Sequence, residues 1–586
     1  MLRTPWGGGW RRFRNPRHVM SARRPADVRQ ALEEVEHAVE RGSYAAGFVT
    51  YEAGAAFGLP VRPAGDAIPL VCFGIFAPEE VDVVGRLPPA GDATLGEWQS
   101  SIDHSGYRNA IEEIKARIEA GDTYQINFTF RLTAPFAGDP LAVMRDLYAA
   151  QAGPWSAYVD ARDYVFCSAS PELFYRVDGS RVVCRPMKGT WPRGYWPDQD
   201  LAHGEALRYS AKNRAENVMI VDLVRNDLGR VATIGSVRPA ALFDVERYPL
   251  QWQMTSTVEA SSNRPGLVPL FDAMFPCGSI TGAPKYSSMR IIRDLESTPR
   301  GIYTGAIGYV SPRGRAHFNV AIRTVSIDRK AGLAGFGVGS GVVWDSVDRD
   351  EYDECLLKAA VLQTVTHLRR LPRRANAAYI VGDPPGFRLL ESIAWTPSEG
   401  FVLLDPHLDR LHASADCFGF PCDLKEVRML LAGVVEDLRG PAKVRVLLEG
   451  TGSVLCEAVD LNPLPHPVRL ALASEPIDPA DVFLYHKTTN RSLYERARAS
   501  QPGADAVILW NDSGDITEAT ESNIVVQRGD RKITPPIACG LLPGILRANL
   551  LESGEIAEGR LSKDDLLASD RIWLINSVRG WMAAEF

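Results

Sequence analysis

One short basic segment constrains what this chain can fold into more than any other feature. Residues 367–377 read HLRRLPRRANA, with four arginines around a proline. Crowded like charges repel one another and stay in solvent, and proline interrupts regular structure. The segment predicts a linker over 367–377 that divides the 586 residues into a domain at 1–366 and a second at 378–586. At roughly 100–200 residues per domain, one simple domain is excluded.

The composition excludes several classes of protein. The formal net charge of −7 argues against a general nucleic-acid binder. The sequence has no run of about 18 or more uncharged apolar residues, so we expect no transmembrane helix and no membrane partner. The nine cysteines are scattered, without a CxxC pair or zinc spacing, which favours free thiols in a reducing cytoplasm.

The N-terminal segment is unusually basic. Its first 24 residues carry seven arginines and no acid. A transit peptide has such a composition, but so does a solvated basic tail, and the tail is the interpretation we favour.

Both parts of the chain mix strand-like and helix-like patterns, which predicts a mixed α+β fold throughout. In the first part, 156–170 and 179–187 read as strands and 107–122 as an amphipathic helix ending at Gly121. In the second part, 401–405, 443–449 and 505–512 read as strands and 424–440 as a helix.

The string EYDECLLKA at 351–359 places two acids and a base on one side of a predicted helix. Glu351, Glu354 and Lys358 are three and four residues apart, and therefore share a face. Two carboxylates can hold a hard cation there, and the lysine can meet a ligand carboxylate beside it. A salt-bridged solvent face is the alternative, and this string alone favours it.

Another candidate carboxylate, Glu216, lies near the start of a helix predicted from about Lys212. The run VMIVDLV in this helix is apolar on nearly all sides, so we expect much of the helix to be buried. A buried carboxylate needs a partner, and Mg²⁺ would supply one. The alternative is an acid favoured by the helix dipole.

Four glycines alternate in GFGVGSGVV, at Gly335, Gly337, Gly339 and Gly341. Alternate residues of a strand share a face, so this face would be bare and open to close approach. Backbone N–H groups exposed in this way can bind a carboxylate. The GxGxxG spacing of a dinucleotide fingerprint is missing.

Nine strings in order resemble the chorismate-utilising enzymes, most closely the large component of aminodeoxychorismate synthase or its relative in anthranilate synthase. They are GFVTYEAGAAF, GDTYQINFT, SASPELF, RPMKGTWPRG, KNRAENVMIVDLVRNDLGRV, FPCGSITGAPK, YTGAIGYV, FNVAIRT and GSGVVWDSVDRDEYDECLLKA. The resemblance runs from about 47 to 359, with a family core at about 105–360. It implies a β-sandwich-type chorismate-binding domain with surrounding helices.

The resemblance also implies roles for single residues. Glu216 and Glu354 would hold Mg²⁺, with Glu351 nearby. Glu172 matches the family's general acid, which needs a raised pKa to carry a proton near neutral pH. The groups expected to bind chorismate are Arg323, Lys358, Tyr303, Thr281, Gln125 and the N–H groups around Gly339.

Three positions discriminate within the family. Lys188 in RPMKGT stands where aminodeoxychorismate synthases have lysine and anthranilate synthases a small residue. It would attack C2 of chorismate and displace the C4 hydroxyl before ammonia enters at C4, although a salt bridge is the alternative. Gln125 stands where water-adding relatives have a lysine base, which argues against isochorismate synthase. Gln253 stands where anthranilate synthases have the histidine linked to pyruvate elimination.

The second part contains the pieces that a pyridoxal-phosphate (PLP) enzyme needs. GLLPGILR at 540–547 is a turn that opens a helix, and its N–H groups at Ile545 and Leu546 suit a phosphate. Arg410 can add a charge-assisted bond. Lys487 in a polar string and Glu518 on a predicted strand could serve the cofactor's aldehyde and ring nitrogen. A surface residue is the alternative for each.

Together the strings LDPHLDRLHASADCFG, YHKTTNRSLYERA, NDSGDITEATESNIVV, GLLPGILRANLL and LINSVRGW resemble the fold-type IV PLP enzymes. The resemblance spans about 387–581 and implies a D-amino-acid aminotransferase-like fold. It implies Lys487 as the lysine that carries PLP and Glu518 at the pyridine nitrogen. The expected phosphate ligands are Arg410, Ile545, Leu546 and Ser577, and Asn523 is a further pocket candidate.

Joined in one chain, the two resemblances imply a bifunctional enzyme that makes p-aminobenzoate, a folate precursor. Ammonia would convert chorismate to 4-amino-4-deoxychorismate, and PLP-dependent elimination of pyruvate would follow. The fusion, rather than a motif, favours a lyase over a transaminase. We expect Mg²⁺, PLP, a separate glutamine amidotransferase and, as in fold-type IV relatives, a homodimer. The alternatives are an anthranilate synthase joined to an aminotransferase, and a non-catalytic C-terminal scaffold.

Overall fold

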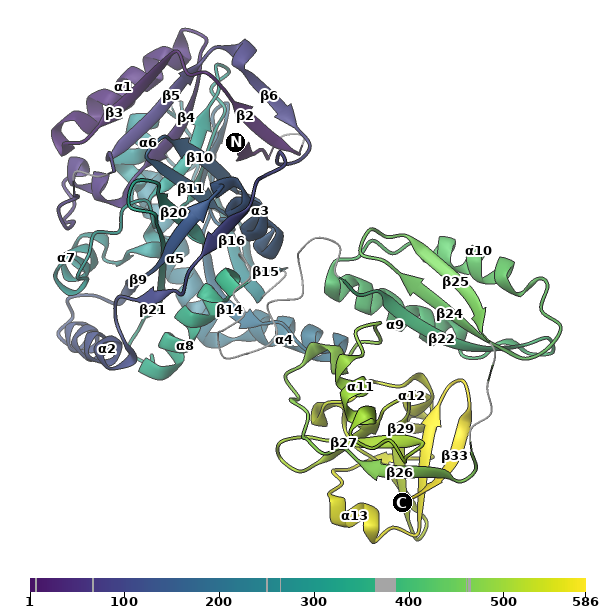
Figure 1. Cartoon of the computed structure of the whole chain (residues 1–586). Helices are drawn as coiled ribbons and strands as arrows, with labels where there is room; N and C mark the ends of the chain where they lie inside the picture. The colour runs from purple at the N-terminus through teal and green to yellow at the C-terminus, as the bar shows by residue number, and fades with distance from the viewer. Residues whose placement is uncertain are drawn as a thin grey trace. The chain divides into compact units, whose positions relative to one another are not determined.

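The computed structural model describes residues 1–5, 8–65, 68–248, 251–263, 265–363, 386–459, 461 and 465–586 (Figure 1). The chain forms two compact units, one of Met1–Arg193 with His203–Pro372 and one of Gly194–Ala202 with Arg373–Phe586. The predicted linker at 367–377 lies outside the described residues. The predicted mixture of helices and strands is confirmed in both units.

The first unit is built on two large antiparallel sheets. Sheet 1 runs in the order β17 (Gly282–Ala283), β9 (Gln125–Gly138), β21 (Leu333–Val342), β20 (Thr324–Asp328), β11 (Tyr164–Ser168), β10 (Ala157–Ala161), β1 (Leu2–Arg3), β2 (Trp10–Phe13) and β6 (Val81–Val84), with β7 (Ala93–Leu95) and β8 (Gln99–Ser100) beside β9. Sheet 2 runs β14 (Met187–Pro192), β16 (Gln251–Ser261), β13 (Arg181–Arg185), β12 (Leu173–Asp178), β19 (Ala316–Val320), β18 (Ala306–Val310), β4 (Tyr44–Val49), β5 (Val71–Phe76) and β3 (His18–Ala22), with β15 (Arg238–Arg247) beside β16.

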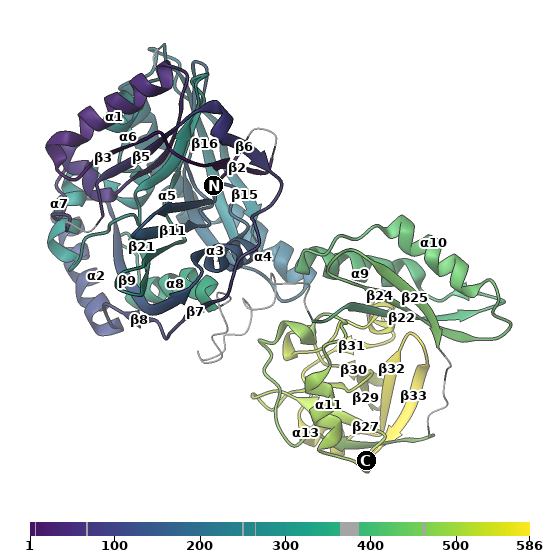
Figure 2. The same cartoon turned by 45° about the horizontal axis from the view of Figure 1, so that its top comes forward.

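The two sheets pack face to face and helices cover their outer faces (Figure 2). Phe48 of sheet 2 meets Phe166 of sheet 1 in the core between them. The helices packed on sheet 1 are α2 (His104–Glu119), α3 (Pro140–Gln151) and α8 (Asp348–Ala359). Those packed on sheet 2 are α1 (Pro25–Glu40), α5 (Ala211–Gly229) and α6 (Leu267–Met274). Helix α7 (Lys285–Leu295) contributes to both outer cores, and α4 (Pro197–Tyr209) precedes α5.

The favoured interpretation of the N-terminal segment as a solvated tail is wrong. Strands β1 and β2 extend sheet 1, and β3 pairs with β5 in sheet 2. Trp10 is 2% exposed, and Arg12 donates to Asp82 of β6 at 3.0 Å. Arg3, Arg11 and Arg12 belong to amphipathic strands whose apolar neighbours enter the core, and Asp82 from a distant strand pairs with Arg12 and, at 3.8 Å, with Arg14.

The second unit contains two sheets, one of four strands and one of eight. The smaller runs β23 (Gly400–Phe401), β22 (Leu389–Thr396), β24 (Ala442–Leu448) and β25 (Val454–Val459), with α9 (Leu404–Phe418) and α10 (Leu424–Val435). The larger runs β28 (Ile516–Ala519), β27 (Ala506–Trp510), β26 (Val468–Leu472), β33 (Gly580–Glu585), β32 (Arg571–Asn576), β29 (Asn523–Arg528), β30 (Arg531–Thr534) and β31 (Ala557–Glu558). It is accompanied by α11 (Ser492–Ala499), α12 (Ile545–Glu552) and α13 (Lys563–Leu567).

One predicted strand is largely absent. Residues 401–405 were expected to be extended, but only Phe401 pairs and α9 begins at Leu404. Leu403 adopts a φ of 51°, which turns the chain out of the sheet before the helix.

The sequence predicted neither a transmembrane helix nor a disulfide framework. In the described part of the chain, none of the helices is long and apolar enough to cross a membrane. No disulfide forms among the cysteines of the same described residues.

Candidate active sites

A cavity of about 130 Å³ lies in the first unit, between the glycine face of β21 and residues of β14, α5 and α8. Several residues singled out from the sequence line it together: Glu172, Lys188, Glu216, Tyr303, Arg323, Gly339, Glu351, Glu354 and Lys358. They come from segments far apart in the sequence, so their convergence is a product of the fold.

Lys188 projects from β14 toward the glycine face of β21. A Cβ at Gly341 would lie 2.7 Å from Lys188 Nζ, so a side chain at this position would push the amino group aside. Burial lowers the pKa of Lys188, while the carboxylates of Glu216, Glu354 and Glu172 oppose that change. A buried lysine with a lowered pKa can lose its proton and act as a nucleophile.

Glu172 lies just before β12 and is 2% exposed. Burial raises its pKa to about 7, against the opposing effects of Ser279 and Lys188. The Ser279 hydroxyl donates to Glu172 Oε1 at 2.6 Å. The carboxyl group is therefore poised to exchange a proton near neutral pH. Ser279 was not singled out from the sequence, although it lies in the string GSITGAPK.

Helix α8 presents its acids and its lysine to the cavity, as the spacing predicted. Lys358 pairs with Glu354 at 2.5 Å and donates to the backbone oxygen of Gly339 at 2.9 Å. Glu351 accepts from the Ser346 hydroxyl at 2.7 Å. These contacts tie α8 to β21 and hold the carboxylates at the cavity wall.

Helix α5 brings Glu216 from the opposite side. Burial raises the pKa of Glu216, and Lys188 opposes the rise. The expectation that much of this helix is buried holds for one face, which packs against sheet 2, whereas Val218 is 40% exposed. Lys212 and Asn213, in the first turn, also line the cavity and were missed.

Mg²⁺ was expected at Glu216, Glu354 and Glu351. All three carboxylates line one cavity, but no group of three His, Cys, Asp or Glu side chains among the described residues is gathered closely enough to hold a metal. Lys358 neutralises Glu354 instead.

The remaining predicted residues of the first site differ in position. Arg323 is 7% exposed, and its Nη1 donates to the backbone oxygen of Lys358 at 2.7 Å. Gln125 is buried beside Gly341, with no hydrogen-bond partner for its amide among the described residues. Thr281 does not line the cavity, because its hydroxyl bonds the backbone of Cys277 and Gly278.

A cavity of about 300 Å³ lies in the second unit. Residues singled out from the sequence line it: Arg410, Lys487, Glu518, Asn523, Ile545 and Ser577. Leu546 does not, and its side chain packs in a small apolar core with Leu550. Its N–H nevertheless lies in the first turn of α12, where backbone donors lack intrahelical acceptors.

Lys487 is held by the edge of β22. Its backbone oxygen accepts from the N–H of Leu390 at 2.9 Å. Burial, reinforced by the charge of Arg410, lowers the pKa of the side chain to about 8. This amine exchanges its proton far more readily near neutral pH than an exposed lysine does.

Glu518, on β28, faces the same cavity. Burial raises its pKa to about 7. The Tyr494 hydroxyl of α11 donates to Glu518 Oε1 at 2.7 Å, and Asn523 Nδ2 reaches Oε2 at 3.4 Å. Tyr494 was not foreseen, because a tyrosine on a short polar helix has no distinctive spacing.

Arg410 of α9 belongs to a buried ion network. Its Nε and Nη2 donate to Glu391 at 2.8 and 2.7 Å, and His407 Nδ1 lies 2.7 Å from the same carboxylate. Burial alone would raise the pKa of Glu391, but these partners outweigh it and bring the pKa to about 2. The network fixes the guanidinium at the cavity wall.

Comparison with known proteins agrees with this division. Residues 77–364 match the family model of chorismate binding enzymes, and residues 388–585 match that of class IV amino-transferases. An aminodeoxychorismate synthase of Streptomyces griseus is 42% identical over 286 residues, which cover 48% of this chain and 39% of that protein. Aminodeoxychorismate synthase component 1 of Escherichia coli is 39% identical over 271 residues, which cover 46% of this chain and 59% of that protein.

Solved structures support the first assignment. A crystal structure of anthranilate synthase component I from Streptococcus pneumoniae covers 60% of this chain and 91% of its own, with a TM-score of 0.52 and 25% identity. The chain matches about two fifths to three fifths of the length of the two curated relatives above. Its residues 77–364 form a domain of the chorismate binding enzyme family, and its residues 388–585 form a domain of the class IV amino-transferase family.

Proposed function

We propose that this chain makes p-aminobenzoate from chorismate and ammonia in two consecutive reactions. The first unit would form 4-amino-4-deoxychorismate at Lys188, and the second would eliminate pyruvate at Lys487. The observation that carries the proposal is the convergence of a buried lysine and a buried glutamic acid in each cavity. The neighbouring family matches supply the order of the two reactions.

In the first reaction, the neutral amine of Lys188 attacks C2 of chorismate. Both conjugated ring double bonds shift and the C4–O bond breaks, while Glu172 donates the proton that makes water the leaving group. Ammonia then bonds to C4, both double bonds return to their original positions, and the Lys188 amine leaves C2. The lowered pKa of Lys188 and the raised pKa of Glu172 suit these roles.

Two cationic side chains and the glycine face would bind the carboxylates of chorismate in this cavity. Arg323 and Lys358 provide the charge, and the N–H groups near Gly339 approach without a side chain between them. Glu216, Glu351 and Glu354 supply hard oxygen donors of the kind that Mg²⁺ prefers. We propose that Glu216 and Glu354, with Glu351 nearby, hold Mg²⁺ once the Lys358–Glu354 pair opens and the carboxylates draw together; the ion would neutralise charge on the chorismate carboxylates.

In the second unit, PLP would supply an electron sink for the bond changes at C4 of the intermediate. The residues present fit it: a buried lysine, a carboxylate on the facing strand and a helix N-terminus border one cavity. Lys487 would move the C4 proton, and Glu518 would face the ring nitrogen. Arg410, Ser577 and the N–H groups of Ile545 and Leu546 would hold the phosphate.

We further propose a separate glutamine amidotransferase as the ammonia source, a cytoplasmic location and a homodimer through the PLP domain. The relatives named "component 1" support the partner. The absence of disulfides among the described cysteines agrees with the location.

Anthranilate formation is the competing function, because the family also includes anthranilate synthases. At the decisive position, Gln253 donates to the backbone oxygen of Gly189 at 2.7 Å and accepts from Thr190 and Gln251. This amide cannot act as an acid or base, which disfavours elimination of pyruvate in the first unit.

Product analysis with chorismate, ammonium, Mg²⁺ and PLP tests the proposal. The full chain should yield p-aminobenzoate, Lys487→Ala should accumulate 4-amino-4-deoxychorismate, and Lys188→Ala should block both products. Anthranilate as the product would overturn the first assignment. Reconstitution that gives no PLP absorbance band would support a non-catalytic scaffold, whereas a band that survives in Lys487→Ala would refute Lys487 as the lysine that carries PLP.

A further inference from the structure

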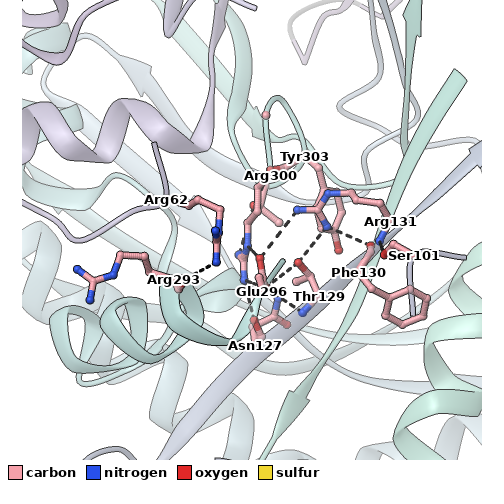
Figure 3. Close-up of polar contacts among 12 residues, drawn as sticks. Arg62, Ser101, Asn127, Thr129, Phe130, Arg131, Arg293, Glu296, Arg300 and Tyr303 are labelled. Carbon is pink, nitrogen blue, oxygen red and sulfur yellow. Dashed lines mark hydrogen bonds and ion pairs between the residues drawn. The ribbon is translucent and has the colours of Figure 1, made fainter. Parts of the chain in front are cut away.

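A third cavity, of about 300 Å³, lies in the first unit and takes no part in the proposed reactions. It adjoins the chorismate cavity, because Tyr303, Phe336 and Gly337 line both. Two buried arginines, Arg131 and Arg300, border it (Figure 3). Their hydrogen bonding differs in a way that points to a ligand.

The guanidinium of Arg300 is fully engaged. Its Nε and Nη2 donate to the two oxygens of Glu296 at 3.0 and 2.7 Å. Its remaining N–H groups reach the backbone oxygens of Ile280 and Asn127 at 2.8 Å, and Thr304 at 3.4 Å. Arg300 and Glu296 therefore neutralise each other and hold the surrounding segments together.

Arg131 has no comparable partner. Its Nη1 donates to Thr129 Oγ1 and the backbone oxygen of Phe130, both at 3.0 Å. Its Nε and Nη2 are buried without a hydrogen-bond partner among the described residues. The nearest carboxylate oxygen, Glu296 Oε2, lies 3.9 Å from Nη2 and already accepts from Arg300.

The other acid at this cavity does not compensate Arg131. Glu52 is 3% exposed and accepts the backbone N–H groups of Arg300 at 2.6 Å and Gly301 at 3.0 Å. Burial raises the pKa of Glu52, and the backbone N–H groups of Arg300 and Gly301 oppose the rise. A buried arginine stays protonated, so a positive charge with unused donors remains beside an open cavity.

We propose that this cavity binds a small aromatic carboxylate, with its carboxylate on Arg131 and its ring against the apolar part of the wall. Ile68, Pro299, Ile302 and Phe336 supply that apolar surface. Two N–H donors of one guanidinium match a carboxylate in bidentate geometry. A cavity of this volume has room for a single ring.

The site is coupled to the chorismate cavity through Tyr303. The Tyr303 ring packs so closely on Gly337 that no Cβ fits there, and the Arg131 guanidinium lies 5.0 Å from the centre of the same ring. A carboxylate that draws Arg131 away weakens this cation–π contact and releases the ring. The ligand should therefore change the affinity for chorismate rather than the chemistry.

Calorimetric titration of the full chain with sodium benzoate tests the proposal. Benzoate should bind the wild type. It should bind Arg131→Met at least tenfold more weakly, and it should bind Arg131→Lys, which keeps the charge, with intermediate affinity. Thr133→Val, at the same cavity, is the matched control and should bind as the wild type does. Lys358→Met in the chorismate cavity should also retain benzoate binding.

Kinetics provide the second readout. Benzoate should raise KM for chorismate in the wild type but not in Arg131→Met. A cooperative thermal unfolding transition should show that this variant is folded. p-Aminobenzoate, used as a second probe, should act in the same way. Two results would overturn the proposal: no benzoate binding to the wild type, or binding that Lys358→Met abolishes and Arg131→Met does not. The binding arm is independent of the proposed reactions, because it requires no turnover.

Discussion

The two candidate active sites contain the same pair of residue types in different electrostatic surroundings. Each contains a buried lysine with a lowered pKa and a buried glutamate whose pKa is raised to about 7. Around Lys188 the nearest charges are mainly acids, which oppose the effect of burial. Around Lys487, Arg410 reinforces it. Burial lowers the pKa of both lysines. The largest effect of a neighbouring charge opposes burial at Lys188, where it comes from Glu216, and reinforces burial at Lys487, where it comes from Arg410.

The largest expected effect tests whether the two cavities act independently. Lys188→Ala and Lys487→Ala should each lower formation of p-aminobenzoate on the order of 10⁴-fold, because each removes the reacting amine. An equimolar mixture of the two variants should restore the product, since each supplies the step that the other lacks. Chromatographic product analysis measures it. A mixture as inactive as its parts would mean that the intermediate does not pass between molecules.

The next effect concerns the ion network of Glu391, His407 and Arg410 at the second cavity. Glu391→Gln leaves Arg410 buried without its countercharge, which should destabilise the second unit by about 3 kcal/mol and weaken PLP binding. Thermal unfolding and PLP titration measure this, while amination by the first unit should continue. Glu457→Gln, at an exposed partner of Arg445, is the matched control and should cost below about 0.5 kcal/mol. Equal effects of the two changes would refute a special role for the network.

A smaller effect should appear only at the first cavity. Gly341→Ala puts a methyl group against Lys188 Nζ and the Gln125 amide, so amination should slow by roughly 10–100-fold. Elimination from added 4-amino-4-deoxychorismate should keep its rate. Gly85→Ala, in open space just after β6, controls for a glycine substitution elsewhere in the first unit. Amination unchanged in Gly341→Ala would show that the glycine face is not needed for Lys188.

The smallest expected effects follow from removing the hydroxyl groups of Ser279 and Tyr494, which donate hydrogen bonds to Glu172 and Glu518. Both bonds stabilise the carboxylate, so removing either raises the pKa above about 7. In Ser279→Ala, Glu172 keeps its proton to higher pH, and the alkaline limb of the pH profile of amination should move to higher pH at constant free ammonia.

In Tyr494→Phe, Glu518 loses negative charge, and PLP should bind roughly fivefold more weakly at neutral pH. Shifts in the opposite directions would reverse the assigned protonation states.

Much of the architecture could be predicted from local pattern. Helices α2, α5, α8 and α10 and strands β10, β11, β21, β24 and β27 lie where periodicity placed them. Residues 401–405 failed because a left-handed residue, Leu403, ends the extended run. The arginine-rich start failed because composition does not reveal a pairing partner such as Asp82.

The candidate sites follow the same division. Lys188, Glu172, Lys487 and Glu518 were identified because resemblance to known families fixes residue type and position. Ser279 was missed because its partner Glu172 lies 107 residues away. For Tyr494 and Glu391, the partners lie 24 and 19 residues away and no motif links them.

The sequence by itself determined which chemical groups this protein has and which families its two parts resemble. Only the tertiary structure decided which of those groups share a cavity and how each holds its proton. The physical reason is that a pKa depends on desolvation and on neighbouring charges, which distant segments supply. Arg131 is the clearest case: the sequence does not show that its Nε and Nη2 lack hydrogen-bond partners among the described residues, or that Nη2 lies 3.9 Å from a Glu296 oxygen that Arg300 already engages.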